Sequence, residues 1–566
     1  MKRLLPLIAL VLLGAAEPPA YDVVIRGGTI YDGSGGTPYT GDVAIKGDRI
    51  AAVGKVDGTG ATEIDARGKA VSPGFVNMLA HPEESLLVDG RALSDLAQGV
   101  TLEVMGEISM GPLSPAMKQE MTEQQGDVRY PVDWTTLGEY LDRLGKKKIS
   151  PNVASFVGAG TVRQVVLGSD DVQPTAAQIA EMQRLVKQAM EEGALGLTDA
   201  LIYTPANFAK TPELIALAKV SAQCGGIYTV HMRSEGDRIE QAIQETIDIA
   251  EASGAPAEIY HFKQAGRDNW GKFDKAVALI EAARARGTRI TANMYNYTAG
   301  ATGLDAAMPN WVQAGGTQAW IARLKDPATR TRVIAAMREA HPADWENFFA
   351  GAGPEGMLLL AFKNPALKPY TGKTLAEVAK LRGKTPEETA MDLVVEDGTR
   401  VGVAYFLMTE ENVRKGIRLP WMSFGSDEAA PAPEGAFLLA KNHPRAYGNF
   451  ARLLGHYVRD TKDITLAEAV RRLTSLPTDN LAIADRGRLK AGQFADVVVF
   501  DPAAITDHAT FDKPAQLATG VSHVLVNGGF AYRDGKAAGA ATGRVVKGRA
   551  ATGGCKAAAS DWAWAR

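Results

Sequence analysis

Residues 227–263 read IYTVHMRSEGDRIEQAIQETIDIAEASGAPAEIYHFK, and this stretch decides the fold. It begins and ends with a short apolar run, and each run leads into a histidine, His231 or His261. Between them, over residues 235–253, apolar residues recur at helical spacing. The pattern predicts a strand, a crossover helix and a second strand parallel to the first. Both histidines then leave the sheet at the same edge.

Two imidazoles at one edge of a sheet can share a metal ion. The alternative is that each is an ordinary core histidine, hydrogen-bonded to the backbone. A cation follows each histidine two residues later, Arg233 in one case and Lys263 in the other. This repetition of the pattern favours the metal site.

Length and composition indicate a soluble protein with more than one domain. A chain of 566 residues is too long for one core of ordinary size, so we expect a large domain and a smaller one. Apolar residues make up 46% and charged residues 22%, which is typical of globular proteins. The net charge of −3 indicates neither nucleic acid nor an acidic membrane as partner. We therefore expect a small-molecule substrate.

Residues 1–16 have the composition of a cleaved signal peptide. Lys2 and Arg3 precede an almost wholly apolar segment that ends at Leu13, and small residues follow it. The segment is too short to span a bilayer, and no other apolar run approaches spanning length. We expect a secreted or periplasmic protein with no membrane span in the mature chain. An uncleaved N-terminal anchor is the alternative.

The chain has only two cysteines, Cys224 and Cys555, which lie far apart in the sequence. This number excludes a disulfide framework and a thiolate-rich metal site. A metal site must therefore be built from histidine and carboxylate.

Short strands joined by tight turns occur near both ends of the chain, over residues 21–72 and 485–550. Neither end is long enough for a core of its own. We expect the two ends to pair into one small β-sandwich, with residues 73–484 inserted between them as the large domain. A C-terminal tail, residues 551–566, follows.

Within the large domain, strand-like apolar runs alternate with helical patterns, which is typical of an α/β fold. Eight runs predict a closed (β/α)8 TIM-type barrel, whose site lies at the carboxyl ends of its strands. An insertion over residues 300–420 separates the seventh and eighth runs, either as a lid over the site or as a surface elaboration. The runs are Val71–Leu79, Val100–Met105, Asn152–Val157, Leu195–Thr198, Ile227–Val230, Ile259–Tyr260, Ile290–Met294 and Trp421–Phe424.

Two carboxylates at predicted strand ends complete the candidate metal site. Asp427 follows the eighth run, where it is either a turn former or the base for a metal-activated water. Glu107 follows the second run and is the best-placed third ligand, unless it is a solvated loop residue. Glu103 is the fallback.

Six segments, in order along the chain, resemble the N-acyl-D-amino-acid deacylase (D-aminoacylase) group of the amidohydrolase superfamily. Both β-rich ends match as well, so the resemblance covers nearly all of the mature chain. The segments are Pro73–Phe75, His231–Arg238, Ile259–Lys263, Thr291–Gly300, Gly425–Asp427 and His443–Gly448.

The resemblance implies zinc-dependent hydrolysis of the N-acyl bond of a D-amino acid. On this basis His231 and His261 are ligands of a tightly bound zinc ion. Asp427 takes a proton from the attacking water and returns it to the leaving amine. The resemblance also implies that Tyr203 donates to the developing oxyanion and that three residues bind the α-carboxylate of the substrate. These three are Lys263, Tyr295 and Arg445.

Two positions depart from the family pattern. The family has a His-x-His pair after Pro-Gly-Phe, but here Leu79 takes the first position and only His81 remains. Leucine cannot bind zinc, so we expect a second metal to be weak or absent. Where the family commonly has a cysteine ligand, this chain has Glu107, and carboxylate is an acceptable zinc ligand. Three protein ligands suffice for catalytic zinc, so we expect a one-metal hydrolase.

Two other functions stay open at this point. The same barrel could hydrolyse a cyclic amide or an isoaspartyl or D-dipeptide, or it could be a catalytically inactive binding barrel, as Leu79 suggests. The set of Lys263, Tyr295 and Arg445 favours a substrate with a free carboxylate. The acyl group, the side chain and the strictness of the D preference depend on pocket shape, and no motif indicates an oligomeric state.

Overall fold

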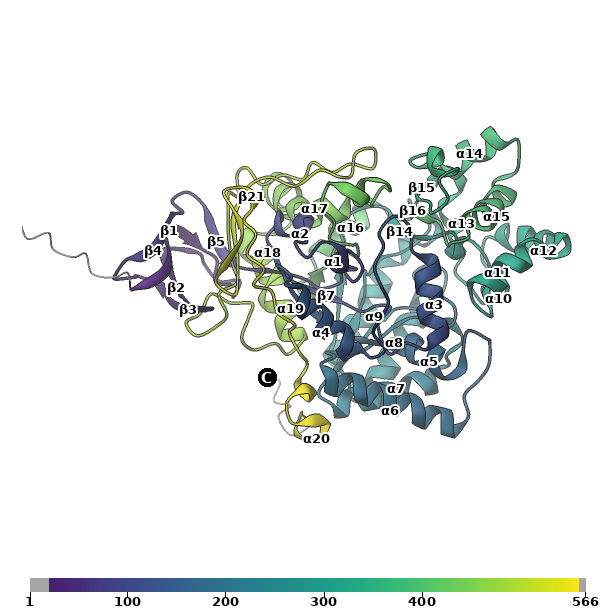
Figure 1. Ribbon diagram of the computed structural model, residues 1–566, viewed down its shortest axis with the longest axis horizontal. Coiled ribbons are helices and arrows are strands. Elements are labelled where there is room, and N and C mark those ends of the chain that lie inside the picture. The colour runs from purple at the N-terminus through teal and green to yellow at the C-terminus, as the bar shows by residue number, and fades with distance from the viewer. Residues whose placement is uncertain (1–19, 559–566) are drawn as a thin grey trace, which may run out of the picture.

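The computed structural model describes residues 20–558. The predicted signal peptide and the last part of the predicted tail lie outside these residues. A small β-rich domain lies at one end of the molecule, the barrel occupies the middle, and the helices of the insertion project at the other end (Figure 1). Within residues 20–558, no helix is both long and apolar enough to cross a membrane.

The small domain is built from both ends of the chain, as the sequence predicts. β18 (Val497–Phe500) pairs with β5 (Ala70–Pro73) and so joins the C-terminal strands to the N-terminal ones. β1 (Tyr21–Ile30) pairs with β4 (Gly60–Asp65) along its first half and with β5 along its second half. In the described chain the order is β21-β20-β19-β18-β5-β1-β2-β3, with β4 beside β1. The other strands are β2 (Tyr39–Lys46), β3 (Arg49–Gly54), β19 (Val521–Val526), β20 (Gly529–Arg533) and β21 (Lys536–Ala537).

The hydrophobic core of this domain is formed by residues from both ends of the chain. Apolar side chains from Ile25, Val43 and Val71 pack in one buried cluster with Val497 and Leu525. These residues come from strands of both ends, so neither end encloses a core alone. The two ends therefore build one domain, as predicted, and in the described chain all of its strands belong to one nine-stranded sheet.

Eight parallel strand positions form the barrel within the described residues, and each predicted run overlaps one of them. The amide of Met78 donates to the carbonyl of Phe424 at 3.1 Å and closes the ring between the first and last strands. At the other seam, the amide of Leu195 donates to the carbonyl of Ser155 at 2.9 Å. The strands are β6 (Phe75–Asn77), β7 (Val100–Met105), β8 (Asn152–Ser155) continued by β9 (Val157–Gly158), β10 (Gly196–Ala200), β11 (Ile227–His231), β12 (Ala257–Ile259), β13 (Ile290–Met294) and β17 (Met422–Phe424).

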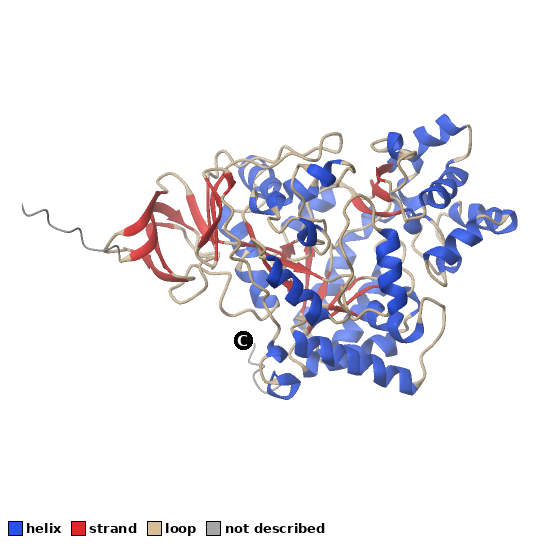
Figure 2. Cartoon of the chain, viewed as in Figure 1, coloured by secondary structure: helices blue, strands red, loops and turns tan. Residues whose placement is uncertain are grey.

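Helices surround these strands (Figure 2). They are α5 (Ala159–Leu167), α6 (Ala176–Glu192), α7 (Thr211–Gln223), α8 (Ile239–Ser253), α9 (Phe273–Ala285), α16 (Glu410–Ile417) and α18 (Leu466–Leu473). Shorter or peripheral helices are α1 (Ser85–Val88), α2 (Leu93–Leu96), α3 (Pro115–Gln124), α4 (Leu137–Lys147), α17 (Arg445–Arg452) and α19 (Ser475–Asn480).

Helix α8 begins at Ile239, the first apolar residue of the predicted helical pattern, and the four residues of the segment before it are not helical. The hydroxyl of Ser234 accepts hydrogen bonds from the amides of Gly236 at 3.3 Å and Arg238 at 3.0 Å. Such a side-chain bond competes with the first helical turn. The residues after β11 therefore form a turn, and Glu235 is not part of the helix.

The insertion has its own apolar core, which includes Leu304, Trp320 and Met391. The same cluster contains Ile202 and Tyr295 from the barrel, so the insertion packs onto the mouth of the barrel. Its antiparallel strands are β14 (Gly300–Gly303), β16 (Gly402–Tyr405) and β15 (Met357–Ala361). Its helices are α10 (Asn310–Gln313), α11 (Thr317–Leu324), α12 (Pro327–Met337), α13 (Phe348–Ala352), α14 (Leu375–Arg382) and α15 (Pro386–Asp397).

A carboxylic acid, Glu258 of β12, is fully buried inside the barrel. Its oxygens accept hydrogen bonds from Asn293 and Ser423, both at 3.2 Å, from Asn480 at 3.3 Å, and from Thr291. Burial raises the pKa of Glu258 to about 7, although these hydrogen bonds act in the opposite direction.

We expect Glu258→Gln to flatten the pH dependence of stability. The pKa of the native carboxyl, about 7, lies above its ordinary value of 4.5. Its contribution to stability is therefore fully present below the unfolded pKa and is lost as the pH rises through the folded pKa. Between pH 5 and pH 8 the variant should gain about 3 kcal/mol relative to wild type in its free energy of unfolding. Urea unfolding at several pH values measures this gain, and parallel curves for the two proteins would contradict it.

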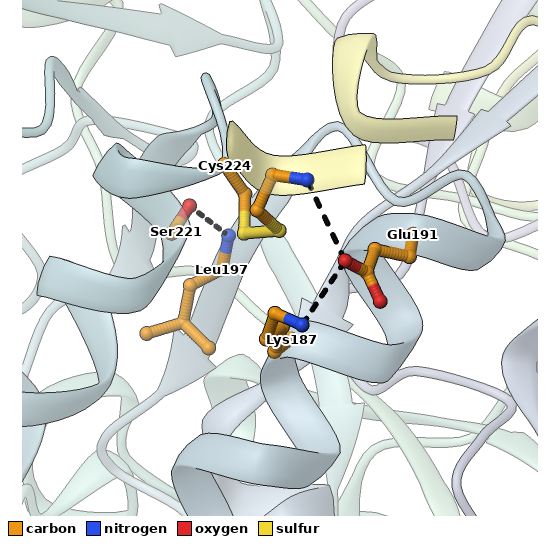
Figure 3. The surroundings of a disulfide bond; sticks show 6 residues. Lys187, Glu191, Leu197, Ser221 and Cys224 are labelled. Atoms are coloured by element: carbon orange, nitrogen blue, oxygen red, sulfur yellow. Dashed lines mark hydrogen bonds and ion pairs between the residues drawn. A yellow bond between two sulfur atoms is a disulfide. The ribbon is translucent and has the colours of Figure 1, made fainter. Parts of the chain in front are cut away.

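The two cysteines form a disulfide between Cys224, just after α7, and Cys555 in α20 (Gly554–Ala558) (Figure 3). This pairing was not predicted, because the chain has only two cysteines and 331 positions separate them. The C-terminal segment nevertheless returns along the barrel, where the amide of Val546 donates to the carbonyl of Val153 at 2.8 Å. Figure 3 shows Glu191 beside the bond, accepting from the amide of Cys555 at 3.5 Å.

We expect Cys555→Ser to lower the free energy of unfolding by about 2–5 kcal/mol, because the bond restricts a long loop in the unfolded chain. Unfolding without reductant measures the loss. The double variant with Cys224→Ser serves as control and should lose the same amount, since both changes remove one bond. An unchanged unfolding midpoint would show that the bond contributes nothing to stability.

Candidate metal and active site

Five predicted residues meet at the carboxyl ends of the barrel strands. His231 is the last residue of β11, and His261 follows β12 by two residues. Glu107 and His81 follow β7 and β6, and Asp427 follows β17. Because every strand of the barrel is parallel, these loops share one mouth.

Two of these residues have an unusual backbone conformation. His261 has a φ of 34° and Asp427 a φ of 53°, both in the left-handed region that non-glycine residues seldom adopt. The amide of His261 donates to the side chain of Asn293 at 2.9 Å, and that of Asp427 donates to the carbonyl of Leu79 at 2.8 Å. Strained residues that neighbouring groups hold in place are typical of functional sites.

Glu107 lies between the two histidines. Its Oε1 is 2.9 Å from Nδ1 of His231 and 3.5 Å from Nε2 of His261. The centres of the two imidazole rings are 4.3 Å apart. Burial alone would raise the pKa of Glu107, but hydrogen bonds from the histidines hold it well below its usual range. Among the described residues, the buried Nε2 of His231 has no hydrogen-bond partner. One carboxylate and two imidazoles, one of them unsatisfied, fit a metal ion such as zinc.

A second group of potential ligands shares Glu107. Its Oε2 is 3.2 Å from Nε2 of His81, which in turn is 3.1 Å from Oδ1 of Asp427. His81, Glu107 and Asp427 can thus surround a second ion. Leu79 is buried and its side chain offers no donor, so this group has three members.

Glu103 lies elsewhere. It is fully buried in β7, and within the described chain neither carboxylate oxygen has a hydrogen-bond partner. Burial raises its pKa well above the usual range. The structure therefore places Glu107, and not Glu103, beside the histidines. The ligand role of Glu107 stays a prediction.

Asp427 is held as an anion. Its Oδ2 forms an ion pair with Nη1 of Arg445 at 2.8 Å. Burial opposes ionisation, but the charges of Arg445 and His261 lower the pKa of Asp427 to about 2. The carboxylate is therefore ionised at neutral pH, with one oxygen toward Arg445 and the other toward His81.

The structure only partly gathers the predicted carboxylate-binding residues. Lys263 and Tyr295 line a cavity of about 240 Å³ beside the histidines. Arg445 is 2% exposed and stacks on the Tyr295 ring, 4.3 Å from its centre, instead of reaching the cavity wall. In the part of the chain that the structure describes, the Tyr295 hydroxyl has no hydrogen-bond partner, so it is available to a ligand.

Tyr203 lines the same cavity, with its ring 5.3 Å from that of His231. Its hydroxyl donates to the side chain of Thr302 at 2.8 Å. Burial raises the pKa of Tyr203, so the hydroxyl keeps its proton and is a suitable donor.

A further carboxylate, Glu235, lies beside the predicted ligands, and no role was predicted for it. It is 1% exposed, pairs with Lys263, and lies 2.9 Å from Nδ1 of His261. A carboxylate in this position fixes the orientation of a ligating imidazole. Glu235 lies four residues after His231, within the segment His231–Arg238 that resembles the family, and this position could have marked it as a candidate site residue.

The insertion also contributes to the cavity. Phe348, Arg400 and Leu407 form part of its wall. Arg400 donates to Thr302 at 2.9 Å and lies 5.0 Å from the centre of the Tyr203 ring. The insertion therefore covers part of the site and is more than a surface elaboration. No local sequence pattern could indicate these contacts, because they depend on how the insertion folds back.

Residues 62–532 match the Amidohydrolase family. The chain is similar to the D-aminoacylase of Alcaligenes xylosoxydans xylosoxydans, with 32% identity over 540 residues that cover 94% of this chain and 99% of the relative. A solved D-aminoacylase structure, described for its binuclear metal center, has 32% identity and a TM-score of 0.77, covering 93% of this chain and 99% of its own. An N-acyl-D-glutamate deacylase of Bordetella bronchiseptica, complexed with zinc and a phosphonate inhibitor, has 28% identity and a TM-score of 0.76, with coverage of 93% and 99%.

Proposed function

The chain belongs to the Amidohydrolase family and to the D-aminoacylase group within it, and from this premise we propose that it removes the acyl group from N-acyl-D-amino acids with a bound zinc ion. The enzyme class follows from membership: it is a hydrolase of carbon–nitrogen bonds in linear amides other than peptides. The observation that carries the proposal is the meeting of Glu107, His231 and His261, with Asp427 ionised beside them.

Glu107, His231 and His261 would hold the zinc ion, which supplies an activated water and polarises the amide carbonyl. The bound zinc of the related deacylase supports this choice of metal. The second group of donors, His81, Glu107 and Asp427, lacks the ligand that Leu79 replaces. We therefore propose one tightly bound ion, with a weak or empty second position.

The protein's own groups then divide the proton transfers and the binding. Asp427, ionised and held by Arg445, takes the proton of the attacking water and delivers it to the nitrogen of the leaving amine. The hydroxyl of Tyr203 turns its one proton from Thr302 to the oxygen on which negative charge develops. Lys263 and Tyr295 bind the α-carboxylate from the cavity wall, and Arg445 adds its charge from behind the tyrosine ring.

We also propose that the protein is exported. The composition of residues 1–16 is that of a signal peptide, and a disulfide such as that between Cys224 and Cys555 is typical of oxidising compartments. Fractionation of the native cells tests this proposal. Recovery of the unprocessed chain with free thiols from the cytoplasm would contradict it.

The proposed reaction is tested by assaying the purified mature protein, with its zinc counted, against paired D and L forms of several N-acyl amino acids. We expect release of the free amine from the D forms and little from the L forms. A hydantoin and an isoaspartyl dipeptide serve as competing substrates. Turnover of these two with none of the N-acyl-D-amino acids would contradict the proposal.

A further inference from the structure

A second, larger cavity of about 730 Å³ adjoins the one beside the metal ligands. The two cavities share part of their walls at His81, Ile108, Thr302 and Arg400. A ligand at the candidate metal site can therefore extend from the first cavity into the second. Nothing in the proposed mechanism uses this space.

The second cavity has an apolar wall. Its apolar lining residues come mainly from the loop after Glu107 and from α3. Ile108, the residue next to the candidate ligand, is 54% exposed and lines both cavities at their junction. Methionine side chains are flexible and polarisable, and they adapt to ligands of varied shape. The apolar residues used in this argument are Ile108, Met110, Leu113, Met117, Met121 and Phe437.

Hydrogen bonds fix the wall that α3 provides. Glu120 accepts from the hydroxyl of Thr317 at 2.8 Å, and Gln124 donates to the carbonyl of Gly398 at 3.3 Å. Both partners belong to the insertion. Helix α3 thus stands between the barrel and the insertion (Figure 1), and the cavity is a built space between them.

The position of the cavity indicates which end of the substrate enters it. In an N-acyl amino acid, the carboxylate and the acyl chain lie on opposite sides of the bond that is cleaved. Lys263 and Tyr295 line only the first cavity of these two, whereas His81 and Ile108 open into the second. A substrate whose carboxylate is at Lys263 therefore directs its acyl group toward Ile108. The part of the first cavity that Phe348 and Leu407 line is then left for its amino-acid side chain.

We propose that this methionine-lined cavity binds a long unbranched acyl chain, so that the substrates are N-acyl-D-amino acids with medium or long fatty acyl groups. This inference rests on the proposed function and names its substrate class. Each methylene buried in the cavity contributes up to about a fourfold factor in kcat/KM.

A series of N-acyl-D-alanines, from acetyl to decanoyl, tests the inference when used below the micellar concentration. We expect kcat/KM to rise about 100-fold or more from acetyl to decanoyl, because the added methylenes are buried. A series of N-acetyl-D-2-amino acids that ends at N-acetyl-D-2-aminoundecanoate, the isomer of N-decanoyl-D-alanine, carries its chain on the other side of the scissile bond and should show no such rise. Equal or falling kcat/KM along the acyl series would overturn the inference and leave the proposed function intact. A rise in kcat/KM only along the isomeric series would have the same consequence.

Met121→Trp tests the cavity itself, with Thr122→Trp as the matched control on the exposed side of α3. Filling the cavity should lower the ratio of decanoyl to acetyl kcat/KM at least about tenfold, and the control should keep the wild-type ratio. An unchanged ratio in Met121→Trp would contradict the inference.

A binding measurement tests the acyl-chain site independently of hydrolysis. Calorimetry of N-decanoyl-D-alanine and N-acetyl-D-alanine with the Asp427→Asn variant needs no turnover. Tighter binding of the decanoyl compound supports the proposal that the cavity binds the acyl chain. If the wild-type protein hydrolyses no N-acyl-D-amino acid, the proposed function fails, but this binding result still stands. Equal binding of the two compounds would overturn the inference.

Discussion

Asp427→Asn is expected to lower kcat for N-acyl-D-amino acids by about 10³-fold, within the range that general-base residues contribute. Asparagine has the same shape as aspartate but cannot take a proton from water at neutral pH. The wild-type carboxylate is ionised there, because Arg445 lowers its pKa to about 2. Since Glu107, His231 and His261 are unchanged, the bound zinc should remain.

The same variant leaves the buried guanidinium of Arg445 without its counter-charge, so the free energy of unfolding should fall by about 3 kcal/mol. Circular dichroism and the zinc content therefore accompany the kinetic assay. If a folded variant that keeps its zinc also keeps wild-type turnover, Asp427 has no part in the proton transfers.

His231→Ala or His261→Ala is expected to abolish hydrolysis together with zinc binding. Each change removes one of three protein ligands, and the remaining two cannot retain the ion through dialysis. Zinc content should fall from about one per chain to near zero, and activity should fall to that of chelated wild type. Metal analysis after dialysis and the amine-release assay measure both quantities.

His508→Ala is the matched control, because this histidine is exposed and its imidazole hydrogen-bonds only to Thr519 among the described residues. It should keep both zinc and activity. A His231→Ala protein that retains full zinc would show that the ion is held elsewhere.

The barrel could be predicted from the sequence because its signals are local. Each strand is a short apolar run, and a functional residue at the end of a run needs no knowledge of distant contacts. His231, His261, Glu107 and Asp427 were found this way, and the structure brings them together. Helix α8 begins at Ile239, the first residue of its apolar pattern, and the hydroxyl of Ser234 bonds to amides of the preceding turn.

Other features depend on contacts between distant segments. Cys224 meets Cys555 only because the C-terminal segment runs back along the barrel. Arg400 reaches the site because the insertion packs on the rim. Arg445 was predicted to grip the substrate, and its side chain stacks against Tyr295 instead of lining the cavity. Periodicity and motif spacing contain no information on contacts between segments that are far apart in the sequence.

The central claim is that Glu107, His231 and His261 together hold the zinc ion of an active hydrolase. Anomalous diffraction at the zinc edge, from crystals of protein that hydrolyses an N-acyl-D-amino acid, tests it most directly. The account predicts one strong peak about 2.0–2.2 Å from a donor atom of each of these three side chains. A peak elsewhere, or no peak in crystals of active protein, would contradict it.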